Sequence, residues 1–338
     1  MTNILHIVGA RPQFIKLHPL HKELACRNIK QSILHTGQHF DENMSDIFFN
    51  EMGIPKPDFN LGIHSLSHGA MTGRMMEGIE AILLSNNFDC VIVYGDTNST
   101  LAAAITARKL NIKIVHVEAG VRNNDFTMPE EVNRVLTDKI SDILLCPTQH
   151  SVDNLVKENI QGGINVGDLM YDAALMHRKQ NVVSHKPYIL VTCHRQENTT
   201  KQALTEIVEA LNIISSDIDI IFPVHPRTRN ILQQLDVTPM FELSSPVGYI
   251  EMLQLVRNSK YVITDSGGIS REAYFFNKPS IVLLKNPVWP EIPCLTSSAD
   301  KSEILSKYNK LNSFVFNSSK IFGDGNARKK IADIIENE

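Results

Sequence analysis

The charged stretch at residues 116–134 contains the side chains that acid–base chemistry requires. Its carboxylates and guanidiniums are Glu118, Glu130, Glu131, Arg122 and Arg134. Carboxylates grouped after a strand-like run are suited to proton transfer, because like charges and partial burial can keep one of them protonated near neutral pH. Arginines beside them are suited to an anionic substrate. A solvated surface loop held by salt bridges is the alternative interpretation of this stretch taken alone.

Similar chemistry recurs after other strand-like runs. The polar or glycine-rich segments that follow such runs begin at Gly9, Gly95, Glu118, His194, His225 and Asp265. Ligands of open α/β sheets bind at the carboxyl ends of the strands. One polar strand end is ordinary, but six of them predict a cleft between two halves of the chain.

The Ser266-Gly267-Gly268 segment opens a predicted helix and has the composition of a phosphate cradle. Glycines let the backbone approach a ligand, free N–H groups point toward it, and the N-terminus of a helix favours negative charge. A plain glycine turn is the alternative. Glu272, one helical turn later, is suited to binding two ribose hydroxyls, or else to compensating the helix dipole. The G-x-G-x-x-G and Walker patterns are absent from the sequence.

His194 and His225 follow two strand-like runs of the second half, each close to an arginine. With Arg195 and Arg227 they are candidates for binding a diphosphate, although a structural histidine is the commoner outcome for either one. Neither histidine has the H-E-x-x-H or cysteine-rich context of a zinc site, so no metal site is predicted. No Gly-x-Ser-x-Gly elbow occurs and no cysteine has an evident electropositive site, so covalent nucleophilic catalysis is poorly supported.

Strands and helices must alternate to place these segments at the edge of a sheet. The strand-like runs are 4–8, 31–36, 90–94, 112–117, 143–146, 188–192, 219–224, 261–264 and 280–284. Helices are expected at 13–27, 71–85, 99–110 (capped by Ser99), 132–141, 205–215, 250–257, 269–276 and in the tail at 320–338. The alternation predicts an α/β fold, with parallel sheets covered by helices in two halves that the polar segment 181–187 connects.

The composition is that of a globular protein of about two domains. The chain has 338 residues, of which 43% are hydrophobic and 21% are charged. A net charge of −4 and the lack of a basic run argue against nucleic-acid binding. No apolar run approaches the ~20 residues of a membrane span, and no signal-peptide pattern opens the chain. Five scattered cysteines favour reduced thiols and a cytoplasmic location.

As an ordered set, these motifs resemble the non-hydrolysing UDP-N-acetylglucosamine 2-epimerase family. The matching segments are 9–16 (GARPQFIK), 36–39 (TGQH), 95–98 (GDTN), 116–122 (HVEAGVR), 129–134 (PEEVNR), 193–198 (CHRQEN), 223–227 (PVHPR) and 265–268 (DSGG) with Glu272. They extend over nearly the whole chain. Each segment alone is a weak signal, but the set is specific.

The resemblance implies two Rossmann-like domains that face each other across a cleft, as in GT-B glycosyltransferases. The N-terminal domain would comprise residues 1–180, with a C-terminal helix at about 320–338 that crosses back to it, and the UDP-binding domain residues 187–319. A homodimer is also implied. The implied reaction inverts C2 of a UDP-linked 2-acetamido sugar by anti elimination of UDP to a 2-acetamidoglucal and re-addition on the other face. It consumes no redox cofactor or metal, and it supplies precursors of surface polysaccharides.

The resemblance also implies roles for individual residues. Acid–base work would fall to Asp96, Glu118, Glu130 and His194, with the C2 base left open. The UDP-sugar would be bound by Arg11, Lys16, Arg134, His225, Met252, Ser266, Gly267, Gly268 and Glu272. Glu272 would hold the ribose, and the loop at 246–252 would hold the uracil, largely through backbone groups. Arg11, Arg134 and the 266–268 segment are suited to stabilising the departing diphosphate.

Departures from the family pattern leave the sugar open. Residues 270–272 (SRE) stand where the family often has Gln-Glu-Glu, and residues 284–288 (LKNPV) replace its usual segment before Trp289. Segments 9–14, 67–74 and 246–249 look more like the branch that includes UDP-2,3-diacetamido-glucuronic acid 2-epimerases. No glutamine occurs between residues 58 and 75, where many bacterial members use one to bind an activating UDP-sugar. Activity without an activator is therefore expected.

Three further functions are alternatives. A hydrolysing relative would release UDP and the free epimerised sugar, but that branch typically has Gly-Asp-Arg at the position of Gly95 and lacks the HVEAG element. A glycosyltransferase of GT-B architecture would require an acceptor and would produce no exchange at C2. A non-catalytic UDP-sugar sensor would keep residues 266–268 and Glu272 while tolerating loss of the carboxylates, which this chain retains.

Overall fold

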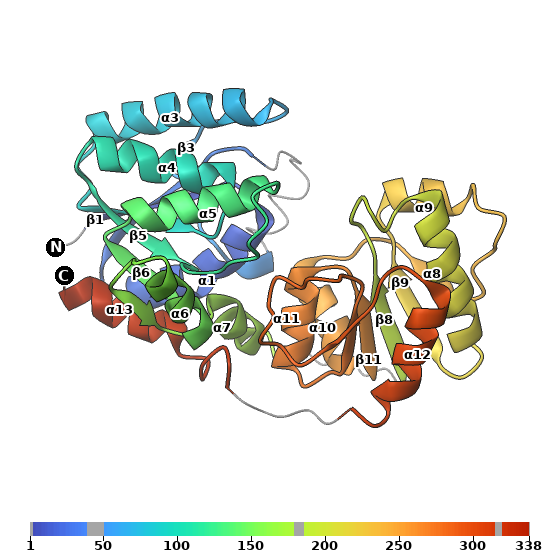
Figure 1. The fold of residues 1–338 in the computed structure, drawn as a ribbon. Coiled ribbons are helices and arrows are strands. Elements are labelled where there is room, and N and C mark those ends of the chain that lie inside the picture. The colour runs from blue at the N-terminus through green and yellow to red at the C-terminus, as the bar shows by residue number, and fades with distance from the viewer. Residues whose placement is uncertain (1–2, 39–50, 179–185, 315–319, 338) are drawn as a thin grey trace. The chain divides into compact units, whose positions relative to one another are not determined.

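The computed structural model describes residues 3–38, 51–178, 186–314 and 320–337. These residues form two compact units, each built on a parallel sheet of its own (Figure 1). Unit 1 comprises Met1–Met176 with Lys320–Glu338, and unit 2 comprises His177–Ser319. The predicted α/β class with two parallel sheets is confirmed.

The sheet of unit 1 runs, over the described residues, in the order β3-β2-β1-β4-β5-β6-β7 with every pairing parallel. The strands are β1 (Asn3–Val8), β2 (Lys30–His35), β3 (Phe59–Asn60), β4 (Cys90–Tyr94), β5 (Lys113–Val117), β6 (Ile143–Cys146) and β7 (Gly163–Asn165). The central strand β4 is buried along its whole length, which explains why its sequence is continuously apolar. The strand order reverses between β1 and β4, and their carboxyl ends are therefore where an open sheet of this kind binds ligands.

Helices cover both faces of this sheet (Figure 1). They are α1 (Arg11–Cys26), α3 (His68–Ser85), α4 (Asn98–Lys109), α5 (Pro129–Ile140), α6 (Gln149–Lys157), α7 (Leu169–Met176) and α13 (Ala327–Asn337). Helix α3 buries Met75, Ile79 and Leu83, which recur every four residues and lie on one side of the helix. They share a core with the small residues Ala103 and Ala107 of α4, so two helices pack closely on that face.

The sheet of unit 2 has the order β10-β9-β8-β11-β12-β13 among the described residues, again all parallel. Its strands are β8 (Tyr188–Thr192), β9 (Asp219–Pro223), β10 (Glu242–Ser244), β11 (Tyr261–Thr264), β12 (Ser280–Val282) and β13 (Leu295–Thr296). Its helices are α8 (Lys201–Ile214), α9 (Pro226–Leu232), α10 (Tyr249–Asn258), α11 (Gly267–Phe275) and α12 (Lys301–Leu311). The order reverses between β8 and β11, which places the residues after these two strands at the second expected binding position.

The C-terminal helix α13 returns to unit 1, as predicted (Figure 1). The buried carboxylate of Asp172 on α7 accepts hydrogen bonds from Ala327 N (3.2 Å) and Arg328 N (2.9 Å) and pairs with the Arg328 guanidinium at 3.0 Å. At the far end of α13, Arg27 pairs with Asp333 at 2.6 Å. Charged groups at both ends and buried isoleucines between them therefore attach this helix to the first unit.

Most element boundaries agree with the sequence predictions to within a few residues, and two differences have a clear cause. Helix α5 begins at Pro129 instead of residue 132, since proline at the first helical position lacks only an N–H that would have no helical partner. Thr97, not Ser99, caps α4 by accepting a hydrogen bond from Thr100 N. The elements that were not predicted are α6, α9, α12, β3, β7, β10 and β13. Except for α12, which has 11 residues, their apolar runs are too brief to show a period. Most of the predicted connection at 181–187 lies outside the described residues.

Candidate active site

Glu118 and Lys16 form an ion pair in the interior of unit 1. The Lys16 Nζ atom lies 2.8 Å from Glu118 Oε1, and the two side chains are 4% and 11% exposed. Lys16 belongs to α1 and Glu118 directly follows β5. The backbone of Glu118 has a φ of 74°, a left-handed conformation that costs free energy in a residue with a side chain. The fold therefore holds Glu118 in a strained backbone conformation, with its carboxylate beside the buried ammonium group of Lys16.

The turn after β4 brings Asp96 close to this pair. Gly95 has a φ of 63°, and a Cβ atom at this position would lie 3.2 Å from Lys16 Nζ and 3.5 Å from Glu118 Oε1. Gly95 N donates to the carbonyl of Val117 at 2.9 Å, so the end of β4 is tied to the end of β5. Glycine is favoured here by both the positive φ and the close approach. The carboxylates of Asp96 and Glu118 thus extend from neighbouring strand ends.

Arg134 on α5 binds the carboxylate of Asp96. Its Nη2 atom donates to Asp96 Oδ2, and its Nη1 atom donates to Glu131 Oε2 at 3.1 Å. Asn133 donates to the backbone carbonyl of Asp96 at 2.9 Å. The Arg134 side chain is 5% exposed whereas that of Asp96 is 27% exposed. Asp96 is therefore fixed in position but remains accessible to a ligand.

The two glutamates at the start of α5 have different surroundings. Glu131 is buried, and its oxygens accept hydrogen bonds from Asn123 N (3.2 Å) and Asn124 N (2.9 Å), so it orders the loop before the helix. Glu130 is exposed in the first turn of α5, where the helix dipole favours a carboxylate. Of the two, only Glu130 is placed to meet a ligand from solvent.

Gln13 connects the turns that carry these groups. Its Oε1 atom accepts from Gly9 N (2.7 Å) and Ala10 N (3.0 Å), and its Nε2 atom donates to the carbonyl of Tyr94 (2.8 Å) and to Thr97 Oγ1 (3.0 Å). One buried amide thereby locks the β1–α1 turn to the β4–α4 turn. This arrangement fixes the start of α1, where the partly exposed Arg11 is the first residue.

His116 and Asp138 lie behind the turns and are both inaccessible to solvent. His116 Nδ1 is 2.7 Å from Asp138 Oδ1, and His116 Nε2 donates to the carbonyl of Gly95 at 2.8 Å. Asp138 Oδ2 accepts from Gly120 N at 3.1 Å and pairs with Arg122 at 2.7 Å. Burial alone would raise the pKa of Asp138, but the charges and hydrogen bonds of His116 and Arg122 lower it below its ordinary value. Asp138 is therefore a buried carboxylate with a full set of donors.

In unit 2, Asp265 organises the residues that follow β8 and β11. Its buried carboxylate accepts from His194 N (3.0 Å) and Arg195 N (2.8 Å), and it lies 3.3 Å from His194 Nδ1. The His194 side chain is 55% exposed. This contact orients the ring through Nδ1 and leaves the other ring nitrogen, Nε2, as the one available to a ligand.

The Ser266-Gly267-Gly268 segment forms the N-terminus of α11. Ser266 is the N-cap, and its Oγ atom accepts from Ile269 N at 3.3 Å. A Cβ atom at Gly268 would meet nothing closer than Ser266 Oγ at 3.7 Å, so the approach to this helix end is open. The first N–H groups of a helix point outward and favour an anion. Glu272, one turn later, is buried.

His225 and Met252 contact structural partners in unit 2. His225 is exposed and caps α9, with its Nδ1 atom accepting from Arg227 N at 3.3 Å. Met252 lies in α10, donates its backbone N–H to the carbonyl of Gly248 at 3.0 Å, and packs its side chain against the core. The backbone N–H of Met252 is therefore engaged within the helix and is not available to a uracil base.

The structure thus brings Lys16, Asp96, Glu118 and Arg134 together in unit 1, and it gathers His194 and the 266–268 segment around Asp265 in unit 2. Sequence reasoning gave no role to Gln13, Asp138 or Asp265. Asp265 and Gln13 lie inside segments that match the family motifs, beside residues that were predicted to bind the substrate. This position in the sequence could have identified them as site residues. Asp138 lies in the last turn of α5 among ordinary charged residues, and only its position one turn after Arg134 indicates that both face the same way.

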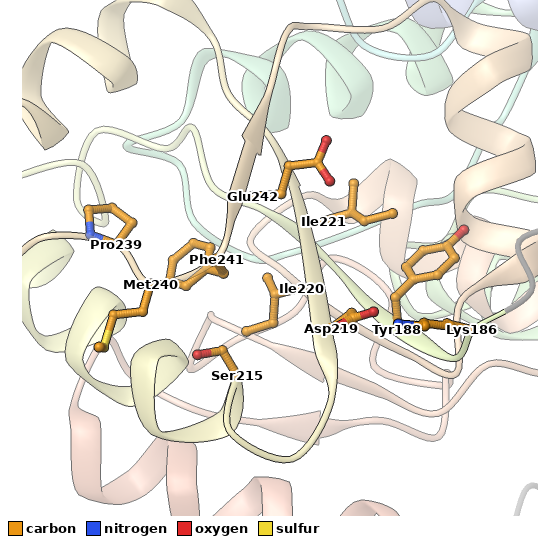
Figure 2. A pocket seen from close by; sticks show the side chains of 10 residues that line it. All are labelled: Lys186, Tyr188, Ser215, Asp219, Ile220, Ile221, Pro239, Met240, Phe241 and Glu242. Carbon is orange, nitrogen blue, oxygen red and sulfur yellow. The ribbon is translucent and has the colours of Figure 1, made fainter.

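An open cavity of about 670 Å³ lies elsewhere in unit 2, at the amino ends of β8, β9 and β10 (Figure 2). Its lining includes Tyr188, Asp219, Phe241 and Glu242, as Figure 2 shows. The candidate residues follow the carboxyl ends of the strands, so this cavity is not part of the candidate site. Within the described ranges, no group of three or more His, Cys, Asp or Glu side chains could hold a metal ion, and no helix is long and apolar enough to cross a membrane.

Comparisons with known proteins agree over almost the full chain. The family model described as UDP-N-acetylglucosamine 2-epimerase matches residues 22–336. A UDP-N-acetylglucosamine 2-epimerase homolog of Methanococcus maripaludis is 47% identical, covering 99% of this chain and 99% of that protein. The UDP-2,3-diacetamido-2,3-dideoxy-D-glucuronate 2-epimerase of Pseudomonas aeruginosa is 43% identical over 98% of this chain and 99% of its own length.

A solved structure supports the same similarity. The Methanocaldococcus jannaschii UDP-GlcNAc 2-epimerase, crystallised with UDP-GlcNAc and UDP, superposes with a TM-score of 0.90 at 37% identity, with 100% of each chain covered. This likeness confirms the predicted GT-B-like fold class.

Proposed function

This chain belongs to the UDP-N-acetylglucosamine 2-epimerase family, and we propose that it inverts C2 of UDP-N-acetylglucosamine to give UDP-N-acetylmannosamine without net hydrolysis. The observation that carries the proposal is the pair of carboxylates, Asp96 and Glu118, at the ends of β4 and β5. Each is held by a cation, Arg134 or Lys16, whose side chain is nearly inaccessible.

The chemistry of the reaction accounts for this arrangement. Elimination breaks the C2–H and C1–O bonds of the sugar, forms a C1=C2 double bond and releases UDP. Re-addition then protonates C2 on the other face while the diphosphate oxygen bonds to C1 again. Each direction requires one group that takes a proton and another that gives one. We assign these exchanges to Asp96, Glu118, Glu130 and His194, and we leave open which carboxylate takes the C2 proton.

The diphosphate leaves as an anion and must be stabilised. We assign this task to Arg11 and Arg134 of unit 1 and to the N-terminus of α11, with Ser266, Gly267 and Gly268. The open approach to Gly268 supports this assignment. Glu272 is assigned to the ribose, and His225 and Met252 to the region around the nucleotide. The segment predicted as a loop at 246–252 is helical from Tyr249 onward, and the N–H of Met252 is bonded within α10, so the contact near Met252 would come from residues 246–248.

A second substrate is favoured by one comparison. The 43% identity to a UDP-2,3-diacetamido-2,3-dideoxy-D-glucuronate 2-epimerase extends over nearly the whole of both proteins. We therefore propose UDP-2,3-diacetamido uronic acid as the alternative substrate. Both candidates are UDP-linked 2-acetamido sugars and undergo the same inversion, so the site chemistry is common to them.

Proton and phosphorus NMR in deuterated water tests both candidates. Incorporation of deuterium at C2 of UDP-GlcNAc, with a new UDP-ManNAc anomeric signal and little free UDP, is the expected result. Stoichiometric release of UDP with free sugar would instead indicate hydrolysis. If UDP-GlcNAc does not react, the same experiment with the diacetamido uronic acid decides between the second substrate and a transferase that needs an acceptor.

We further propose that the chain works as a homodimer in the cytoplasm. Burial raises the pKa of the Cys90 thiol to about 12 and that of the Cys193 thiol well above its ordinary value, so both thiols stay protonated and inert. Such free buried thiols suit a reducing compartment. Light scattering after size-exclusion chromatography tests the dimer, since a mass near 37.9 kDa would show a monomer.

A further inference from the structure

Asp138 joins helix α5 to both turns that carry the assigned carboxylates, in addition to the contacts of Asn133 and Arg134 with Asp96. Its Oδ2 atom accepts from Gly120 N at 3.1 Å, two residues after Glu118. Its Oδ1 atom lies 2.7 Å from His116 Nδ1, and the same ring donates from Nε2 to the carbonyl of Gly95, one residue before Asp96. One inaccessible carboxylate is therefore connected to the β5 turn directly and to the β4 turn through His116.

The β5 turn requires such a restraint because its backbone is strained. Glu118 and Gly120 have φ values of 74° and 77°, both in the left-handed region. A Cβ atom at Gly120 would lie 2.2 Å from the carbonyl oxygen of Ser151, so this residue has no alternative to glycine. A strained conformation persists only where surrounding contacts over-determine it. The bond from Gly120 N to Asp138 is one of those contacts.

The hydrogen-bond pattern also orients the ring of His116. Its Nε2 atom faces a carbonyl, which can only accept, so Nε2 carries a proton. Asp138 Oδ1 holds the ring from its Nδ1 side, while Asp138 Oδ2 accepts from Gly120 N and pairs with Arg122 at 2.7 Å. An asparagine at this position has one acceptor oxygen and no charge, so it cannot replace both carboxylate oxygens.

We propose that Asp138 is a positioning residue for the epimerisation, which orients His116, binds Gly120 N and thereby fixes the turns of Asp96 and Glu118. The proposal rests on the function proposed above. It assigns no contact between Asp138 and the substrate. Because a misplacement of about 1 Å in reacting groups can cost about 100-fold in rate, loss of this restraint should act mainly on kcat.

The test uses Asp138→Asn in the full chain, with Asp172→Asn as the matched control. Both residues are buried aspartates of unit 1 that pair with an arginine, but Asp172 holds α13 and touches neither turn. Asp138→Asn should lower kcat for C2 inversion about 10- to 100-fold, with KM and the Kd of UDP within about twofold of wild type. Asp172→Asn should lose thermal stability but keep kcat within about twofold. An Asp138→Asn enzyme with wild-type kcat, or an equal loss of kcat in both variants, would overturn the proposal.

A second measurement needs no turnover. Nitrogen-15 NMR of histidine-labelled wild-type protein should show an Nε2 proton of His116 that is protected from exchange, and Asp138→Asn should make this proton exchange faster. A wild-type His116 without a protected Nε2 proton contradicts the proposal even if the variant fails to fold. If the wild-type protein epimerises neither candidate sugar, the proposed function fails, whereas the ring measurement still decides whether Asp138 orients His116.

Discussion

Replacement of Glu118 by glutamine tests the candidate site most directly. The change keeps the size of the side chain but removes the negative charge 2.8 Å from Lys16 Nζ. At that separation two unit charges attract by about 6 kcal/mol at an effective dielectric constant of about 20, which desolvation largely offsets. Loss of one partner from a buried pair typically costs 3–5 kcal/mol, roughly, because the other charge stays buried. We expect a clear loss of thermal stability and a fall in C2 exchange of about 100-fold or more, the scale of one positioned acid–base group.

A second change separates the two effects. Lys16→Met combined with Glu118→Gln removes the uncompensated ammonium, so the double variant should recover much of the stability while C2 exchange remains low. Calorimetry gives the stability, deuterium incorporation at C2 gives the exchange rate, and titration with UDP shows whether the nucleotide still binds. Near wild-type exchange in Glu118→Gln would refute the catalytic assignment. A double variant no more stable than the single one would refute the argument from charge.

Three further changes test other parts of the structure. His194→Ala should reduce C2 exchange by about 100-fold while UDP still binds, and unchanged exchange would remove His194 from the acid–base set. Burial, with a smaller effect of His21, lowers the pKa of His6 to about 3 from its ordinary value of 6.5. The unfolded chain therefore binds a proton at His6 that the folded chain does not, so stability should fall by about 1.4 kcal/mol per unit as the pH drops from 6.5 toward 3. Urea titrations across that window should show the slope, and His6→Gln should reduce it. Asp172→Ala should release α13, which hydrogen exchange would report as faster exchange of residues 327–337 than in the wild type.

Much of the fold followed from simple patterns in the sequence. The runs at 90–94 and 188–192 are buried on both faces and read as continuous apolar strands, so their limits were predicted correctly. The short edge strand β10 has half-exposed residues and no comparable signal. Helix α9 is only seven residues long, too short to show a helical period. The strands and helices predicted from the sequence were therefore mainly those with a long and strongly apolar pattern.

Residues of the candidate site could be predicted from the sequence where a chemically suitable side chain lies inside a segment that matches a family motif. Glu118, Asp96 and Lys16 stood in recognised segments, and the structure brings them together. The contact between Lys16 and Glu118 joins residues far apart in sequence, so no local spacing could indicate it. Asp138 was not predicted because its role depends on which side of α5 is buried and on which residues of the neighbouring turns it contacts.

The return of α13 to unit 1 has a consequence for synthesis of the chain. Unit 1 is made of two segments of sequence, and all of unit 2 is translated between them. The apolar side of α13, with Ile331 and Ile335, covers a surface of unit 1 that stays uncovered until residues 327–337 leave the ribosome. Unit 2 has no such dependence and can complete its core earlier. Truncation within residues 327–337 should therefore damage the first unit to be synthesised, and a nascent chain stalled before that point should expose apolar surface to chaperones.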